Sequence, residues 1–96
     1  MKASEIATKA AELTGGDRNA THGDIVATHR NIANIWNAIL EAAGKAPDAP
    51  IDAYDVANMM EGLKIARRYS GRFNIDDHID GAGYAAVAGE IGSRGR

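Results

Sequence analysis

The stretch DIVATHRNIANIWNAILEAA, residues 24–43, has the longest helical periodicity in the sequence. Its large apolar side chains recur every three or four residues, the spacing that places them on one face of an α-helix. These residues are Ile25, Ile32, Trp36, Ile39 and Leu40. Gly44 and the segment APDAP at 46–50 follow, and glycine and proline disfavour helix continuation. The stretch therefore predicts a long amphipathic helix from about Asp24 to Ala43.

A shorter helix is predicted before this stretch, over about residues 5–13. Ser4 is suited to cap its start, and Gly15 with Gly16 ends it. Its apolar stripe is thin and consists of Ile6, Ala10 and Leu13. Residues 1–15 are thus interpreted as an N-terminal helix.

Two more helices are predicted in the second half of the chain, over about residues 52–70 and 77–91. Asp52 is a good N-cap residue for the first of them, and Asp55 favours the positive end of the helix dipole. The residues expected to face inward are Val56, Met59, Met60, Leu63, Ile79, Val87 and Ile91. No segment alternates convincingly between apolar and polar residues, so the prediction is an all-α bundle of about four helices. Its 96 residues form a single domain with a flexible basic tail at 92–96.

Charge and composition exclude several classes of protein. The formal net charge is −2, which does not favour bulk nucleic acid as a partner. Cysteine is absent, so disulfides and thiolate chemistry are excluded. No apolar run approaches the roughly 18 residues of a membrane span, and the N-terminus does not resemble a signal peptide. We therefore expect a cytoplasmic protein that does not bind membranes.

Ionisable residues occur on the predicted apolar faces. At about 100° per residue, Arg67, Asp80 and His29 each fall within the apolar stripe of their own helix. A short connection between antiparallel helices would bring Arg67 and Asp80 together, with Lys64 and Tyr84 nearby. One interpretation is a buried structural ion pair with a core histidine. The other is a polar pocket between the helices that binds a ligand.

The loop GGDRNATHGD at 15–24 leads into the start of a helix, where free N–H groups favour an anion. It adds Arg18 and His22 to the pocket, and Gly23 would let the backbone approach a ligand closely. Trp36 is suited to stack on a base, although a tryptophan on an inner helix face is more often part of the core. The predicted ligand-binding residues are Arg18, His22, Gly23, Asp24, His29, Trp36, Lys64, Arg67, Asp80 and Tyr84.

Four motifs are spread along the chain: R-x-x-x-H-G-D at 18–24, I-A-x-x-W at 32–36, D-V-A-x-M-M-x-x-L-K-x-A-R at 55–67 and D-G-A-G-Y-A-A at 80–86. Together they resemble a family of small proteins of unknown function from tailed phages and prophages. This resemblance implies a phage accessory protein in the cytoplasm of an infected or lysogenic bacterium. Because a tyrosine often replaces the first histidine in that family, His22 is not expected to be an obligatory catalytic base.

The spacing D-x-x-D-x-x-x-Y at 77–84 and the helical layout are more distantly similar to the all-α MazG-like nucleotide pyrophosphatases. Those enzymes hold Mg²⁺ between two carboxylate pairs, each spaced one helical turn apart. Asp77 and Asp80 match the second pair. The first pair has no counterpart, because Glu61 is followed three residues later by Lys64. The resemblance implies a Mg²⁺ site at Asp77 and Asp80 that lacks half of its ligands.

Three functions follow from this sequence. The first is binding of a nucleotide or nucleotide-derived signalling molecule without hydrolysis, for example to sequester a host-defence signal. The second is a Mg²⁺-dependent nucleoside triphosphate pyrophosphohydrolase. The third is a protein-binding inhibitor of a host factor. For each we expect a homodimer or a higher homo-oligomer, because helices rich in alanine and glycine bury limited apolar area and allow close approach of another helix.

Overall fold

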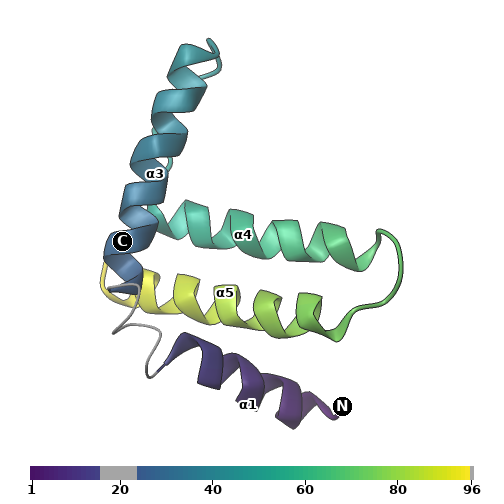
Figure 1. Cartoon of the computed structure of the whole chain (residues 1–96). Helices are drawn as coiled ribbons and strands as arrows, with labels where there is room; N and C mark the ends of the chain where they lie inside the picture. Colours follow the sequence, from purple (N-terminus) through teal and green to yellow (C-terminus); the bar gives the residue numbers. More distant parts are fainter. Residues whose placement is uncertain (16–23, 96) are drawn as a thin grey trace.

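The computed structural model of the protein describes residues 1–15 and 24–95. Within them the chain forms helices α1 (Ala3–Thr14), α3 (Ile25–Ala42), α4 (Ala53–Arg68) and α5 (Ile75–Ser93), and no strand (Figure 1). The predicted all-α fold of about four helices is confirmed. None of these described helices is both long and apolar enough to cross a membrane.

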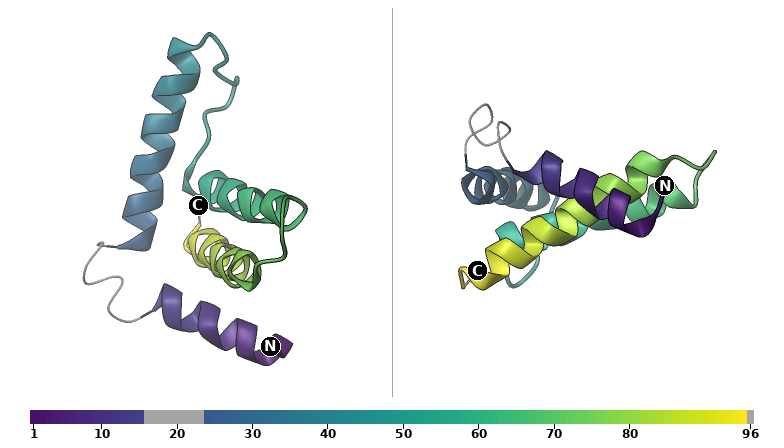
Figure 2. Two further views of the ribbon diagram at one scale, coloured as in Figure 1. Left: turned by 45° about the vertical axis from the view of Figure 1, so that its right-hand side comes forward. Right: turned by 90° about the horizontal axis from the view of Figure 1, so that it is seen from below.

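Helix α5 is the central helix of the fold. It runs antiparallel beside α4, and α1 packs along its other side. Helix α3 crosses the end of this layer and packs mainly against α4. The second half of α3 extends beyond α4, which is visible in Figure 1 and in the left view of Figure 2. The chain therefore has one well-packed layer and one helix that projects from it.

Side-chain caps define where three of the helices begin. Asp52 accepts a hydrogen bond from the N–H of Asp55 at 2.9 Å, and Asp55 in turn accepts one from the N–H of Asp52 at 3.0 Å. This reciprocal capping box confirms Asp52 as the predicted N-cap residue. Asp24 caps α3. Asn74 caps α5, which begins at Ile75, two residues earlier than predicted.

The predicted cap at Ser4 is wrong. Helix α1 begins at Ala3, with Lys2 at the N-cap position, so Ser4 lies inside its first turn. Glu5 accepts a hydrogen bond from the N–H of Lys2 at 3.0 Å, which satisfies one of the free donors at this helix end. A carboxylate three residues into the helix therefore replaces the expected serine cap.

Small residues dominate the buried core. The buried apolar residues are Ala10, Val26, Ala33, Ala53, Val56, Ala57, Ile79, Val87, Ala88 and Ile91. Four larger residues that were predicted to face inward are exposed instead, namely Leu13, Ile39, Met59 and Leu63. The reason on α4 is that its small side, with Ala53 and Ala57, packs toward α5. Helices approach more closely through small residues, so the larger side chains of α4 turn outward.

Three glycines of α5 face neighbouring helices of the same chain. A Cβ atom at Gly81 would lie 3.6 Å from the Cβ of Lys64 on α4. One at Gly83 would lie 3.4 Å from the Thr14 side chain on α1, and one at Gly92 would lie 3.2 Å from the ring of Tyr54. The small residues of α5 thus accommodate helices of the same chain.

Candidate functional site

An ion pair joins α4 to α5 at Asp80. The Nζ atom of Lys64 lies 3.0 Å from Oδ2 of Asp80, and both side chains are partly buried. The predicted partner of Asp80 was Arg67, and that prediction is wrong, because Lys64 pairs with Asp80 while Arg67 is exposed. The rotation of α4 that buries Ala57 also places Lys64, about 20° away in helical phase, toward α5.

Arg68, one turn after Lys64, also reaches α5. Its Nη2 atom donates to the carbonyl oxygen of Asp77 at 3.5 Å. The guanidinium occupies the space that a side chain at residue 81 would fill, since a Cβ atom built on Gly81 would overlap Nη2 of Arg68. Gly81 therefore has a packing role: it leaves a slot for Arg68 against the backbone of α5.

An open polar hollow of about 420 Å³ lies between the end of α4, the following turn and the start of α5. The residues that line this polar hollow are Lys64, Arg67, Ser70, Arg72, Asn74, Asp76, Asp77 and Asp80. It brings together four of the predicted site residues, which are Lys64, Arg67, Asp77 and Asp80. Three cations face three carboxylates there, and Lys64 already neutralises Asp80.

The turn between α4 and α5 contributes residues that sequence reasoning missed. Arg72 and Asn74 line the polar hollow, and Phe73 between them is 73% exposed. Tyr69, just after α4, is 88% exposed. The ring centroid of Phe73 lies 5.7 Å from that of His78. The sequence feature that could have indicated these residues is a short turn that carries two aromatic residues and an arginine.

A smaller hollow of about 130 Å³ adjoins the polar hollow at Asp80. Its lining comes from α1, α3 and α5 and consists of Leu13, Thr14, Ile25, Ile79, Asp80, Gly83, Tyr84 and Val87. We call it the apolar hollow, because most of these side chains are hydrocarbon. Asp80 lines both hollows and Tyr84 lines only this one, so the two predicted residues lie on adjoining surfaces of α5.

His29 is 3% exposed and lies beside Tyr84, with ring centroids 6.4 Å apart. Its Nδ1 atom is 2.9 Å from the carbonyl oxygen of Ile25, a geometry in which the ring N–H donates to that oxygen. Its Nε2 atom is buried and has no hydrogen-bond partner among the described residues. The predicted inward position of His29 is confirmed, whereas it lines neither the polar nor the apolar hollow.

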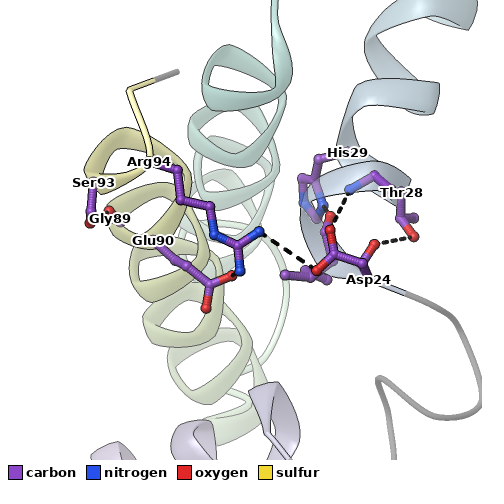
Figure 3. A network of polar contacts seen from close by, with 9 residues as sticks. Asp24, Thr28, His29, Gly89, Glu90, Ser93 and Arg94 are labelled. Atoms are coloured by element: carbon purple, nitrogen blue, oxygen red, sulfur yellow. Dashed lines mark hydrogen bonds and ion pairs between the residues drawn. The ribbon is translucent and has the colours of Figure 1, made fainter.

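The remaining predicted residues are placed elsewhere. Trp36 is half-buried on α3 and lines neither of these hollows. Asp24 caps α3 by accepting from the N–H of Ala27 at 3.1 Å, and Arg94 approaches its carboxylate at 3.7 Å (Figure 3). Arg94 also pairs with Glu90 at 3.1 Å, so this network joins the end of α5 to the start of α3. Arg18, His22 and Gly23 lie outside the described residues.

The metal prediction rests on Asp77 and Asp80, which line the same hollow. In residues 1–15 and 24–95, no three histidine, aspartate or glutamate side chains are grouped so as to hold a metal ion. The Lys64 ammonium already occupies one side of Asp80. A Mg²⁺ ion here would therefore depend on aspartates together with ligand phosphates and water, an arrangement that Mg²⁺ commonly adopts.

Comparisons with known proteins identify relatives of this chain. No solved structure matches it. The "Gene 55 protein" of Mycobacterium phage L5 is 38% identical over 82 residues, which cover 85% of this chain and 49% of that protein. The chain thus spans about half the length of this relative. These matches support the resemblance to a phage protein family and leave the likeness to MazG-like enzymes a prediction. A family model matches residues 5–92, and the chain therefore belongs to the family described as Domain of unknown function (DUF6378).

Proposed function

We propose that this protein binds a nucleotide or a nucleotide-derived small molecule at the polar hollow. The observation that carries the proposal is the position of Arg67 and Arg72 in one hollow, together with the 73% exposure of Phe73, which follows Arg72 in the same turn. A guanidinium offers paired N–H donors that match two oxygens of a phosphate group. An exposed aromatic ring offers a stacking surface for a base.

The aspartates of the polar hollow favour a small ligand over a polyanion. Lys64 neutralises Asp80, which leaves Asp76 and Asp77 beside the two arginines. Carboxylates repel a continuous chain of phosphates, but they accept hydrogen bonds from ribose hydroxyls and base amino groups. A hollow with both signs of charge suits a ligand that has a phosphate at one end and neutral donors at the other.

Binding without turnover is the function that these contacts support best. The ammonium of Lys64, 3.0 Å from Oδ2 of Asp80, competes with a metal ion for that carboxylate. Retention of the intact ligand fits a protein that sequesters a signalling molecule. The competing proposal, a Mg²⁺-dependent pyrophosphohydrolase, rests on the carboxylates of Asp77 and Asp80 in the same hollow.

Isothermal titration with linear and cyclic nucleotides tests the binding proposal. Replacing Arg67→Gln or Arg72→Gln should weaken the affinity about tenfold or more, because each change removes charge-assisted hydrogen bonds to phosphate. Arg30→Gln is the matched control, since Arg30 is exposed on α3 and does not line the polar hollow. Equal loss of affinity in the Arg30 variant, or binding of no nucleotide by the unaltered protein, would contradict the proposal.

Recovery of the ligand separates sequestration from hydrolysis. The complex is incubated with Mg²⁺, and the released ligand is then identified by chromatography and mass spectrometry. Intact ligand in stoichiometric amount supports sequestration. Release of pyrophosphate and a monophosphate in many turnovers would establish the pyrophosphohydrolase instead.

A further inference from the structure

The middle and second half of α3 carry an apolar stripe that the described chain leaves largely uncovered. We define the α3 stripe as Ile32, Ile35, Trp36 and Ile39. Ile35 is 61% exposed and Ile39 is 59% exposed, while the other two are half-buried. The buried residues of α3 are Val26, His29 and Ala33, all in its first part. The projecting half of the helix in Figure 2 is thus the half whose large apolar residues lack cover.

The α3 stripe has the spacing and chemistry of a helix-packing surface. Its members are separated by three, one and three residues, so they lie on one face of the helix. The charged residues Arg30 and Glu41 fall about 170° from the centre of this face, counting 100° per residue. Interface cores are depleted of charge in the same way.

The molecule exposes more surface than a compact monomer of its mass. The accessible surface is 6474 Å², whereas a compact monomer of 10.1 kDa exposes about 5,300 Å². The radius of gyration is 14.6 Å, against about 12.5 Å for a compact domain of this length. The excess of about 1,200 Å² exceeds the roughly 800 Å² that each partner buries in a stable interface.

We propose that a second copy of this chain covers the α3 stripe, with the two α3 helices packed antiparallel about a two-fold axis. The spacing of the stripe reads the same in both directions, so the stripe is complementary to its own copy. With the axis between Ile35 and Trp36, these two residues face each other across the interface, and Ile32 faces Ile39 of the partner subunit.

Charge insertion into the α3 stripe tests this interface. Light scattering on the unaltered chain should give twice the mass of one chain, and the double variant Ile35→Glu, Ile39→Glu should give a single chain. The matched control is Ile65→Glu, because Ile65 is 41% exposed on α4 but lies outside the proposed interface. Circular dichroism establishes that each variant is helical. A single-chain mass for the unaltered protein, or an unchanged dimer in the double variant, would overturn the proposal.

A disulfide test avoids the disruption that glutamate causes. Because the chain has no cysteine, Ile35→Cys introduces one thiol next to the proposed two-fold axis. Oxidation should convert most of this variant to a covalent dimer, while Ile65→Cys stays largely monomeric under the same conditions. Equal yields from the two variants would contradict the antiparallel α3 arrangement.

This interface is independent of the proposed ligand. No residue of the α3 stripe lines the polar hollow. The Ile35→Glu, Ile39→Glu variant should therefore bind nucleotide as the unaltered chain does. Loss of the dimer with retained binding supports the interface alone, and a dimer that binds no nucleotide contradicts only the proposed function.

Discussion

Helix α5 and the second half of α3 show opposite uses of side-chain size. Along α5, Gly81, Gly83, Val87, Ala88 and Ile91 are buried because α4 and α1 pack on either side. Along the second half of α3, the side chains are larger and more apolar, yet they remain exposed. Close contact between helices in this chain thus depends on small residues.

This difference separates the residues that hold one chain together from those available to a partner. Burial of small residues removes only a limited apolar area from water. Since each Å² of buried apolar area stabilises the fold by roughly 25 cal/mol, a core of small residues contributes limited stabilisation. The larger apolar side chains outside the core are the remaining source of stabilisation. A chain with this distribution gains more from assembly than one whose large residues are already buried.

The largest expected effect tests the contrast between the two helices. Ile91→Ala should lower the free energy of unfolding by about 2–5 kcal/mol, because Ile91 lies in the core cluster with Val26 and Ala57. Ile39→Ala should cost less than about 0.5 kcal/mol at low protein concentration, where chains are separate. Denaturant titration at two protein concentrations measures both.

The concentration dependence is the critical part of this comparison. The Ile39→Ala penalty should grow as protein concentration rises, because the α3 stripe is then covered by a second copy. The Ile91→Ala penalty should stay the same. If Ile39→Ala were as costly as Ile91→Ala at the lowest concentration, α3 would already be packed within one chain.

A pair of glycine substitutions tests why α5 packs closely. Gly89→Ala should stabilise the protein by about 1 kcal/mol, because alanine favours a helix and a Cβ atom there meets nothing within 4 Å. Gly81→Ala should be less stable than Gly89→Ala by up to about 1 kcal/mol, since the new methyl group moves the Arg68 guanidinium at the end of its flexible side chain. Thermal unfolding of both variants measures the difference. Equal stabilisation would show that Arg68 does not need the slot.

The smallest expected effect concerns which residue of α4 pairs with Asp80 on α5. A double-mutant cycle on Lys64→Met and Asp80→Asn should give a coupling energy of about 0.5–1 kcal/mol, since the pair is only partly buried. The same cycle with Arg67→Met in place of Lys64→Met should give a coupling energy below about 0.3 kcal/mol. A larger coupling energy for Arg67 than for Lys64 would show that Arg67 is the partner of Asp80, as the sequence predicted.

The helices were predictable because their boundaries and periodicity are local properties. Asp52 capped its helix as predicted, and the phase of α3 placed His29 inward. The rotation of α4 was not predictable in the same way. Val56 on the predicted inner face is buried, but Leu63 and Arg67 on the same face are exposed. The helix is turned so that Ala57 packs in the core with Val87 and Ile91, and Lys64 pairs with Asp80.

The polar hollow was only partly predictable for a related reason. Arg67 and Asp80 stood out because their charges interrupted an apolar periodicity, and Lys64 was noted beside them. Arg72 and Asn74 lie in a turn, where no periodicity exists to be interrupted. Their approach to the helical residues results from the antiparallel reversal between α4 and α5, which brings the end of one helix beside the start of the next.

A residue-resolved NMR titration with the best-binding nucleotide tests the proposed division of the molecule most directly. The proposal predicts that ligand shifts the backbone amide signals of Arg67, Arg72, Phe73 and Asp77, while those of Ile35 and Ile39 stay unchanged. Signals that move mainly on the α3 stripe, or that fail to move anywhere, would contradict a nucleotide site at the polar hollow.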